Sequence, residues 1–387
     1  MLASGSTNTV FLARAQSSDT LNTDPHSGGA QPPTRPARSF EIDCLRVLSA
    51  STLFYWHVGL STGWPLYSYS SWATGVFVTT SVFCAVRFSR HRKHLLQGGL
   101  RGAWLFVADR FVAVYPAYAI ITMLIFAGSF LHPAVGRESG FSVQELVINL
   151  MMINAYVGAR FFTAPMWFIP FIFQVYILIP LLCRLIRWPR AALAMTTAIS
   201  VLMSMLAYRV APLQAAEICR TWSPVFRLPP VFLGVALGML PSSKWPQVVM
   251  TFAICVVSET ALIFVLPDMQ LTLIRQMQGL VALVLLTLLA VLVARLVRAI
   301  PSVDWWTTLL GQASFPFFIT HAVLVSFIWS RVGGAIAVWL TYFFVCWMGA
   351  AAFALVYRSG IEQLRRVVFS REAWMSDLDG RSAVGTR

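Results

Sequence analysis

The feature that most constrains the fold is a series of apolar runs, each long enough to cross a lipid bilayer. About 20 apolar residues in a helix span the hydrocarbon core of a membrane. Only 11% of the residues are charged, against about 25% in a soluble domain. The sequence therefore predicts an all-α polytopic membrane protein, a bundle of about ten transmembrane helices. The predicted spans are 45–63, 72–88, 111–131, 166–187, 191–211, 225–241, 247–266, 277–297, 309–329 and 334–357.

A further apolar run, "ELVINLMMINAYVG" near 145–158, is short for a span and predicts a re-entrant or interfacial helix. The distribution of Lys and Arg supports this interpretation. With the N-terminus inside, most basic residues fall in inner segments, as in membrane proteins generally. A full span at 145–158 would instead turn the basic "RLIRWPR" segment outward. Both termini are then cytoplasmic, and a bacterial inner membrane is the expected location.

The two ends of the chain differ from the predicted transmembrane domain at 40–358. Residues 1–39 are polar and rich in Pro, Gly, Ser and Thr, which predicts a disordered cytoplasmic tail. Residues 359–387 form a basic cytoplasmic tail. The net charge of +14 reflects the topology signal rather than binding to nucleic acid. The six cysteines are scattered without metal-ligand spacing, so they are expected to be packing residues, and no metal site is predicted.

The first span carries ionisable residues on one face, where lipid would make them costly. Arg46 and His57 are eleven residues apart, about three helical turns plus 20°, and Asp43 lies within about 40° of the same face. Asp43 and Arg46 have the i, i+3 spacing of a local ion pair. Histidine suits proton abstraction near neutral pH. The simpler alternative is a histidine bonded to a carbonyl of a neighbouring helix, with a packing role alone.

Three segments carry a family resemblance that covers about 40 to 358. "RSFEIDCLRVLSASTLFYWH" resembles the opening signature of the acyltransferase family 3 membrane proteins, an Asp-x-x-Arg followed after ten residues by a histidine. "LGQASFPFFITH" is similar to the family's Gly-x-x-Ser-Phe…His run, and "MWFIPFIFQVYILIP" resembles its Trp…Tyr…Pro span. The residues that match the first two motifs are Asp43, Arg46, His57, Gly311, Ser314, Phe315 and His321.

This resemblance implies transfer of an acyl group, usually acetyl, from cytoplasmic acyl-CoA to a carbohydrate hydroxyl. The acceptor could be an exopolysaccharide repeat unit, an O-antigen or a lipo-oligosaccharide. Acetyl-CoA would be a co-substrate, and no permanently bound cofactor is expected. No periplasmic domain is expected after the last span, so the acceptor would dock on the bundle itself, which suits a lipid-linked sugar. The expected partners are membrane lipids, acyl-CoA and the carbohydrate, and no nucleic acid.

The donor is polyanionic, and the sequence offers basic residues near the predicted cytoplasmic face. The loop with Arg90, Arg92 and Lys93, together with Arg110, could bind coenzyme A. The topology signal alone explains most of these charges equally well. The third predicted span also departs from the family pattern. In "DRFVAVYP", Arg110 is kept, but the second arginine of the motif is replaced by Ala113.

The roles expected of the remaining residues follow from this resemblance and from side-chain chemistry. His57 would remove the proton of the acceptor hydroxyl, or would form an acetyl-histidine intermediate. Arg46, held by Asp43, would position the donor or balance charge. His321 is either a support residue or a buried structural histidine. Supporting or hydrogen-bonding positions in the bundle are Ser314, Gln174, Tyr176 and Trp167.

Two other functions remain open at the level of sequence. A polytopic transporter or exporter of a glycan intermediate would also place ionisable residues inside the membrane. It has no support from an internal repeat. A succinyltransferase of periplasmic glucans is the alternative enzyme, since the sequence does not distinguish acetyl from succinyl.

Overall fold

The computed structural model describes residues 40–62, 73–89, 99–131, 141–157, 162, 164–210, 223–265, 285–297, 300, 303–332 and 336–369. Every regular element in these ranges is a helix. Three helices are long and apolar enough to cross a membrane, at Gly99–Phe130, Phe168–Arg187 and Val338–Arg365. These findings confirm the all-helical class of a membrane protein. The count of ten spans remains a prediction. Residues 1–39 and 370–387 of the two predicted tails lie outside the described part.

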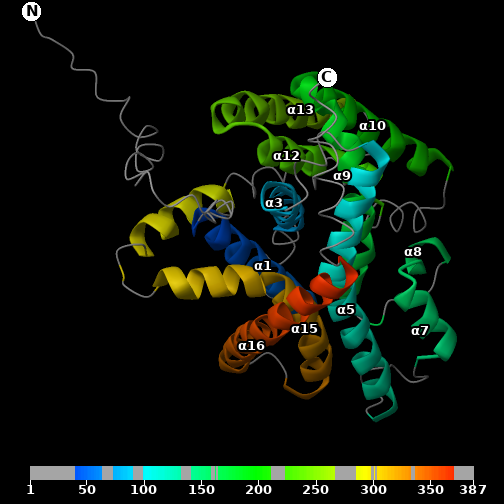
Figure 1. Cartoon of the computed structure of the whole chain (residues 1–387), viewed down its shortest axis with the longest axis vertical. Coiled ribbons are helices and arrows are strands. Elements are labelled where there is room, and N and C mark those ends of the chain that lie inside the picture. Colours follow the sequence, from blue (N-terminus) through cyan, green and yellow to red (C-terminus); the bar gives the residue numbers. More distant parts are fainter. Residues whose placement is uncertain are drawn as a thin grey trace, which may run out of the picture. The chain divides into compact units, whose positions relative to one another are not determined.

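Four helices form the part of the bundle that holds the ionisable residues of interest. Helix α15 (Val303–Val332) packs against both α1 (Phe40–Thr62) and α16 (Ile336–Val368). Helix α5 (Gly99–Leu131) contacts α15 and α16 in turn. These four helices are labelled in Figure 1, with α15 between α1 and α16. The arrangement brings the first and last parts of the chain together.

A second group of helices is organised around α12 (Leu228–Met239), which follows the short helix η4 (Pro224–Arg227). Helix α12 contacts α3 (Ala73–Arg87), α9 (Phe168–Arg184), α10 (Pro189–Val210) and α13 (Trp245–Val265). A Cβ atom at Gly234 would lie 2.6 Å from the carbonyl oxygen of Thr79, and one at Gly238 would lie 3.0 Å from Val86 Cβ. Two glycines four residues apart therefore allow the backbones of α12 and α3 to approach closely, a common device between membrane helices.

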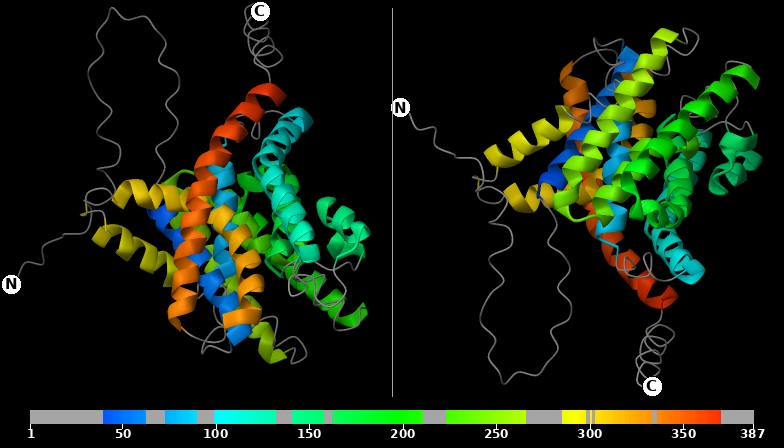
Figure 2. Two further views of the ribbon diagram at one scale, coloured as in Figure 1. Left: turned by 90° about the horizontal axis from the view of Figure 1, so that it is seen from below. Right: turned by 90° about the horizontal axis from the view of Figure 1, so that it is seen from above.

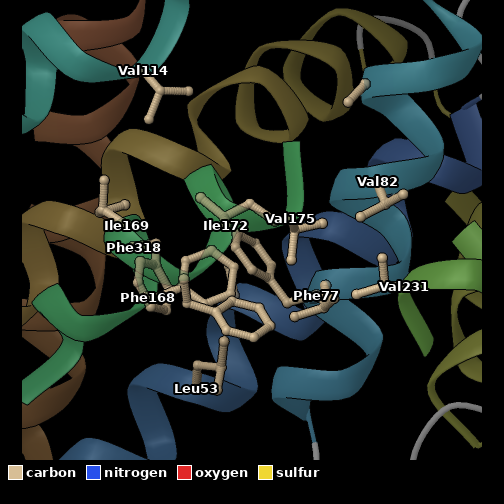
Figure 3. Packing of buried hydrophobic residues seen from close by; sticks show 14 of the residues in the cluster. Leu53, Phe77, Val82, Val114, Phe168, Ile169, Ile172, Val175, Val231 and Phe318 are labelled. Carbon is tan, nitrogen blue, oxygen red and sulfur yellow. The ribbon is translucent and has the colours of Figure 1, made fainter. Parts of the chain in front are cut away.

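Aromatic packing joins the two groups of helices. The rings of Phe77 on α3, Phe168 on α9 and Phe318 on α15 pack together, with centroids 4.7–5.3 Å apart in each pair. Figure 3 shows these rings beside Leu53 of α1, in the interior of the cluster. The helix that carries the predicted catalytic histidine is thus fixed against the rest of the bundle by buried apolar contacts.

The short run predicted at 145–158 forms two short helices, α7 (Val143–Leu150) and α8 (Asn154–Val157). A reciprocal Ser142–Glu145 capping box starts α7. Eight helical residues rise only about 12 Å, too little to cross a bilayer. Tyr118 of α5 donates a hydrogen bond of 2.7 Å to the carbonyl oxygen of Asn149, so α7 is attached to α5 (Figure 1).

Helices α5 and α16 contact each other (Figure 2), and both are longer than predicted. Each has 33 residues, or about 50 Å. Helix α16 continues to Val368, whereas its predicted span ends at 357. The Tyr357 hydroxyl of α16 donates to Ala113 O at 3.1 Å and accepts from Ala117 N at 3.2 Å. It therefore bridges the backbone of α5 beside Pro116, where proline interrupts the helical hydrogen bonds.

Candidate active site

The contact between α1 and α15 brings the first and second sequence motifs together, although more than 250 residues separate them. The rings of His57 and His321 lie 5.3 Å apart between centroids. At the other end of this contact, the Asp43 side chain packs directly on Gly311. A Cβ atom on Gly311 would lie 2.6 Å from Asp43 Cβ and Cγ, so only glycine fits there without a shift. The two helices therefore run in the same direction, and both histidines lie on the C-terminal side of the Asp43–Gly311 contact.

His321 is completely buried, and its protonation pattern follows from its hydrogen bond. Its Nδ1 atom lies 2.9 Å from the carbonyl oxygen of Phe317. Because a carbonyl oxygen can only accept, Nδ1 carries the proton, and Nε2 is left as the acceptor nitrogen. Within the described residues, Nε2 has no hydrogen-bond partner. Two imidazoles, one with an acceptor nitrogen defined by geometry, thus lie side by side in a buried site that could accept and hold a proton.

Aromatic rings surround the two imidazoles. Phe54 of α1 lies 6.1 Å from His321, and Phe317 stacks on Trp347 of α16 at 4.0 Å. The Trp56 ring is 4.5 Å from His57. These rings limit the access of water, and a drier environment strengthens the electrostatic interactions inside it.

The predicted ion pair between Asp43 and Arg46 is not among the ion pairs that the described residues form. The side chain of Asp43 is buried against Gly311 of α15 instead of following the surface of its own helix. Arg46 faces a different neighbour. It lies close enough to Tyr176 of α9 to interact electrostatically with its hydroxyl group. Asp43 thus makes a contact with α15 that the i, i+3 spacing does not predict.

A cluster of charged residues lies where α5 meets α16. The carboxylate of Asp109 forms ion pairs with Arg110, its neighbour on α5, and with Nε of Arg365 on α16, the latter at 3.0 Å. The Arg365 guanidinium also reaches Glu362 at 3.3 Å. The Asp109 side chain is only 1% exposed, whereas the arginines are 19% and 16% exposed. We refer to Asp109, Arg110, Arg365 and Glu362 as the α5–α16 charge cluster.

The charge cluster is linked to Arg46 through Tyr176. The Arg110 guanidinium lies 5.9 Å from the centroid of Phe106, whose ring packs edge-on against Tyr176. Both Arg110 and Arg46 interact electrostatically with the Tyr176 hydroxyl group. Arginines from α1 and α5 therefore lie in the region of one tyrosine of α9, toward the end of α1 opposite to His57. Such an arrangement can hold an anionic group in this part of the bundle.

Three of the other predicted site residues, Ser314, Gln174 and Trp167, lie among the described residues. Ser314 donates a hydrogen bond of 2.9 Å to Gly311 O, so its hydroxyl stabilises its own helix. Gln174 is half-buried on α9. Trp167, in the short helix η2 (Ala164–Trp167), is buried, and the Arg227 guanidinium lies 5.6 Å from the centroid of its ring. The predicted donor-binding residues Arg90, Arg92 and Lys93 lie outside the described residues.

Two arginines near these groups have no role in the sequence-based predictions. Arg365 lies beyond the predicted end of the last span, so it appears in the sequence as one of several basic residues of a tail. Arg227 appears as one of several charges in outer segments. No local pattern in the sequence distinguishes either residue, because their contacts with Asp109 and Trp167 are made between distant helices.

The comparisons with known proteins identify the family. A family model described as an acyltransferase domain, that of acyltransferase family 3, matches residues 39–358. The chain therefore belongs to this family, as the three motifs predict, and is an acyltransferase of the membrane. Neither the curated proteins nor the solved structures contain a match.

Proposed function

We propose that this member of acyltransferase family 3 is a bacterial inner-membrane O-acetyltransferase. It transfers acetyl from acetyl-CoA to a hydroxyl group of a cell-surface carbohydrate, such as an exopolysaccharide repeat unit, an O-antigen or a lipo-oligosaccharide. The observation that carries this proposal is the pair of buried imidazoles, His57 and His321, on the helices that hold the two motifs. Family membership supports acyl transfer, and the donor and acceptor are the proposed part.

In this mechanism, His57 acts as the general base. It removes the proton from the acceptor hydroxyl while the hydroxyl oxygen attacks the thioester carbonyl carbon. A carbon–oxygen bond forms, the carbon–sulfur bond breaks, and the proton held by His57 passes to the departing thiolate. The products are the acetylated sugar and free coenzyme A. The alternative route forms an acetyl-histidine first and then transfers its acetyl group to the hydroxyl.

The donor would approach from the end of the bundle where the arginines lie. Arg46 and Arg110 both act on Tyr176 at that end. Arg46 and His57 are on one helix, about 16 Å apart along its axis. An extended donor could therefore leave its phosphates near the arginines while its thioester reaches the histidines. The predicted orientation places the arginine end at the cytoplasm, where acetyl-CoA is made.

The test replaces His57 with glutamine, which keeps hydrogen bonding and cannot take up a proton. We expect His57→Gln to lower acetyl transfer by at least a hundredfold, within the range of general-base catalysis. The protein level in the membrane should be unchanged. The matched control is Thr52→Ala, since the Thr52 hydroxyl, on the same helix, donates to Leu48 O and not to the site.

Membrane vesicles supplied with labelled acetyl-CoA and purified acceptor glycan provide the assay. Mass spectrometry of the glycan distinguishes an acetyl from a succinyl group. If wild-type vesicles move the glycan across the membrane without consuming any thioester, the protein is a transporter and the proposal is wrong. Near-normal transfer by His57→Gln would exclude the general-base role while leaving acyl transfer itself in place.

A further inference from the structure

The orientation of the His321 ring is fixed by contacts on several sides. Phe317 stacks on this ring, with 5.4 Å between the centroids and 17° between the ring planes. Phe317 in turn stacks on Trp347 of α16 at 4.0 Å, and Phe318 meets His321 edge-on at 5.5 Å. The Nδ1 atom lies 2.9 Å from Phe317 O. Because packing and a hydrogen bond both hold the ring, the direction of its second nitrogen, Nε2, is set before any ligand binds.

Nε2 of His321 is a buried acceptor that needs a donor. In the neutral ring Nδ1 carries the proton, because Phe317 O can only accept, so Nε2 accepts a hydrogen bond and donates none. No donor in the described part of the chain reaches Nε2, although the residue is completely buried. Buried polar atoms are nearly always partnered, because an unmade hydrogen bond is costly away from water. The donor to this nitrogen is therefore expected to come from outside the protein.

The reacting hydroxyl group cannot be that donor. In the mechanism proposed above, its one proton passes to His57. The oxygen then has no further proton to donate, whereas Nε2 of His321 only accepts. The two rings, 5.3 Å apart between centroids, therefore need separate donors. Because the rings are neighbours, the second donor lies close to the reacting hydroxyl and belongs to the same acceptor molecule.

Two hydroxyl groups on adjacent carbons of a sugar match this arrangement. Their oxygen atoms lie side by side, and each can reach a ring nitrogen at about 2.8 Å. Two neighbouring oxygens thus fit the two neighbouring imidazoles. A hydroxyl without a hydroxyl neighbour, such as the primary hydroxyl of a hexose, would leave Nε2 without a donor.

We propose that the acceptor is a vicinal diol, in which His57 deprotonates one hydroxyl group and His321 Nε2 accepts a hydrogen bond from the other. This inference rests on the proposed function and narrows its acceptor to sugars with free hydroxyl groups on adjacent carbons. His321 is then a specificity-determining residue, because only a hydroxyl with a free neighbour supplies donors to both rings. The bonds formed and broken are those given above, and the second hydroxyl keeps its proton.

The first measurement locates the acetyl ester on the native glycan. Nuclear magnetic resonance of glycan from cells with and without the gene assigns the carbon that carries the ester. We expect this carbon to be adjacent to one with a free hydroxyl group. An ester at a primary hydroxyl, or between two substituted carbons, overturns the inference and leaves the O-acetyltransferase in place. A succinyl ester would change the donor, and its position would decide the inference in the same way.

A deoxy acceptor tests the second hydrogen bond directly. The probe is a synthetic repeat unit of the mapped glycan, in which the acylated hydroxyl is kept and its neighbour is replaced by hydrogen. Wild-type vesicles should use it with a kcat/KM ten- to a hundredfold lower than that of the intact unit, as expected for one buried hydrogen bond. Equal kcat/KM for both units would overturn the inference, because Nε2 would then not depend on the acceptor for its donor.

The variant His321→Phe separates this contact from a role in packing. Phenylalanine keeps an aromatic ring in the stack and removes Nε2. It should lower kcat/KM for the intact unit ten- to a hundredfold and leave kcat/KM for the deoxy unit within about threefold of wild type, since the two changes remove the same contact. An equal loss with both units would mean a structural role alone and overturn the inference. The matched control is Thr320→Val on the same helix, because the Thr320 hydroxyl donates to Pro316 O. Thr320→Val should keep the wild-type preference.

Failure of the proposed function would look different from failure of the inference. Wild-type vesicles that acylate no carbohydrate would end both, whereas an ester in the wrong position ends the inference alone. The ester position and the wild-type preference need no variant. They decide the inference even if His321→Phe does not accumulate in the membrane.

Discussion

Replacing Gly311 with alanine should impair catalysis through a shift of two helices, with no loss of a reacting group. The added Cβ atom would lie 2.6 Å from Asp43 Cβ and Cγ, whereas ordinary van der Waals contacts begin at 3.4 Å. The added atom would therefore lie about 0.8 Å closer than an ordinary contact allows, so α1 and α15 must separate by roughly 1 Å. The clash includes the Cβ atom of the buried Asp43 side chain as well as its carboxylate, so a rotation of the carboxylate alone cannot relieve it and the helices have to move.

The expected magnitude follows from this displacement. Overpacking of a buried contact costs about 1–3 kcal/mol, and alanine in place of glycine in a helix returns up to about 1 kcal/mol. The net loss of stability should therefore be about 2 kcal/mol or less, and the protein should remain folded. The same two helices carry His57 and His321, and a 1 Å misplacement of reacting groups can lower the rate about a hundredfold. We expect kcat/KM for acetyl transfer to fall ten- to a hundredfold.

The assay compares Gly311→Ala with Gly349→Ala, in acetyl transfer by vesicles and in thermal unfolding of the purified protein. Gly349 is in the interior of α16, and a Cβ atom there would meet nothing within 4 Å. Gly349→Ala should be fully active and slightly more stable than wild type. Wild-type activity and stability in Gly311→Ala would show that α1 and α15 do not approach as closely as the structure places them.

Two further changes test other contacts. Arg46→Lys should lower acetyl transfer at least tenfold although it keeps the charge, because lysine replaces a planar fork with a point charge; full activity in the vesicle assay would mean that charge alone suffices. Tyr357→Phe should lower the free energy of unfolding by about 1–2 kcal/mol, since the hydroxyl makes two backbone hydrogen bonds to α5. Thermal unfolding measures this loss, and Tyr342→Phe on the same helix is the control. Equal stability of the two variants would contradict the bridging role.

The sequence predicts the helical class and the motif residues because both depend on local patterns. Apolar runs of spanning length indicate membrane helices whatever their neighbours are. The spacing of Arg46 and His57 likewise places both on one face of α1. The motifs and the family match agree on the acyltransferase family.

Contacts between distant helices are what the sequence does not predict. The local spacing of Asp43 and Arg46 gives no indication of Gly311, yet Asp43 packs on this residue of a helix more than 250 residues away. The proximity of His57 and His321 depends on the same packing of α1 on α15. Arg365 is the clearest case. The last span predicted from hydropathy ends at 357, whereas α16 continues to Val368 and places Arg365 beside Asp109.

The position of α16 in the chain has a consequence for biosynthesis. Helix α5 ends at Leu131 and α16 begins at Ile336, so more than half of the polypeptide is translated between them. Until the last helix is inserted, Asp109 lacks its ion pair with Arg365, and the backbone next to Pro116 lacks the Tyr357 bridge. A nascent or prematurely terminated chain can therefore contain His57 while α5 still lacks its contacts with α16. These contacts form only when translation is nearly over.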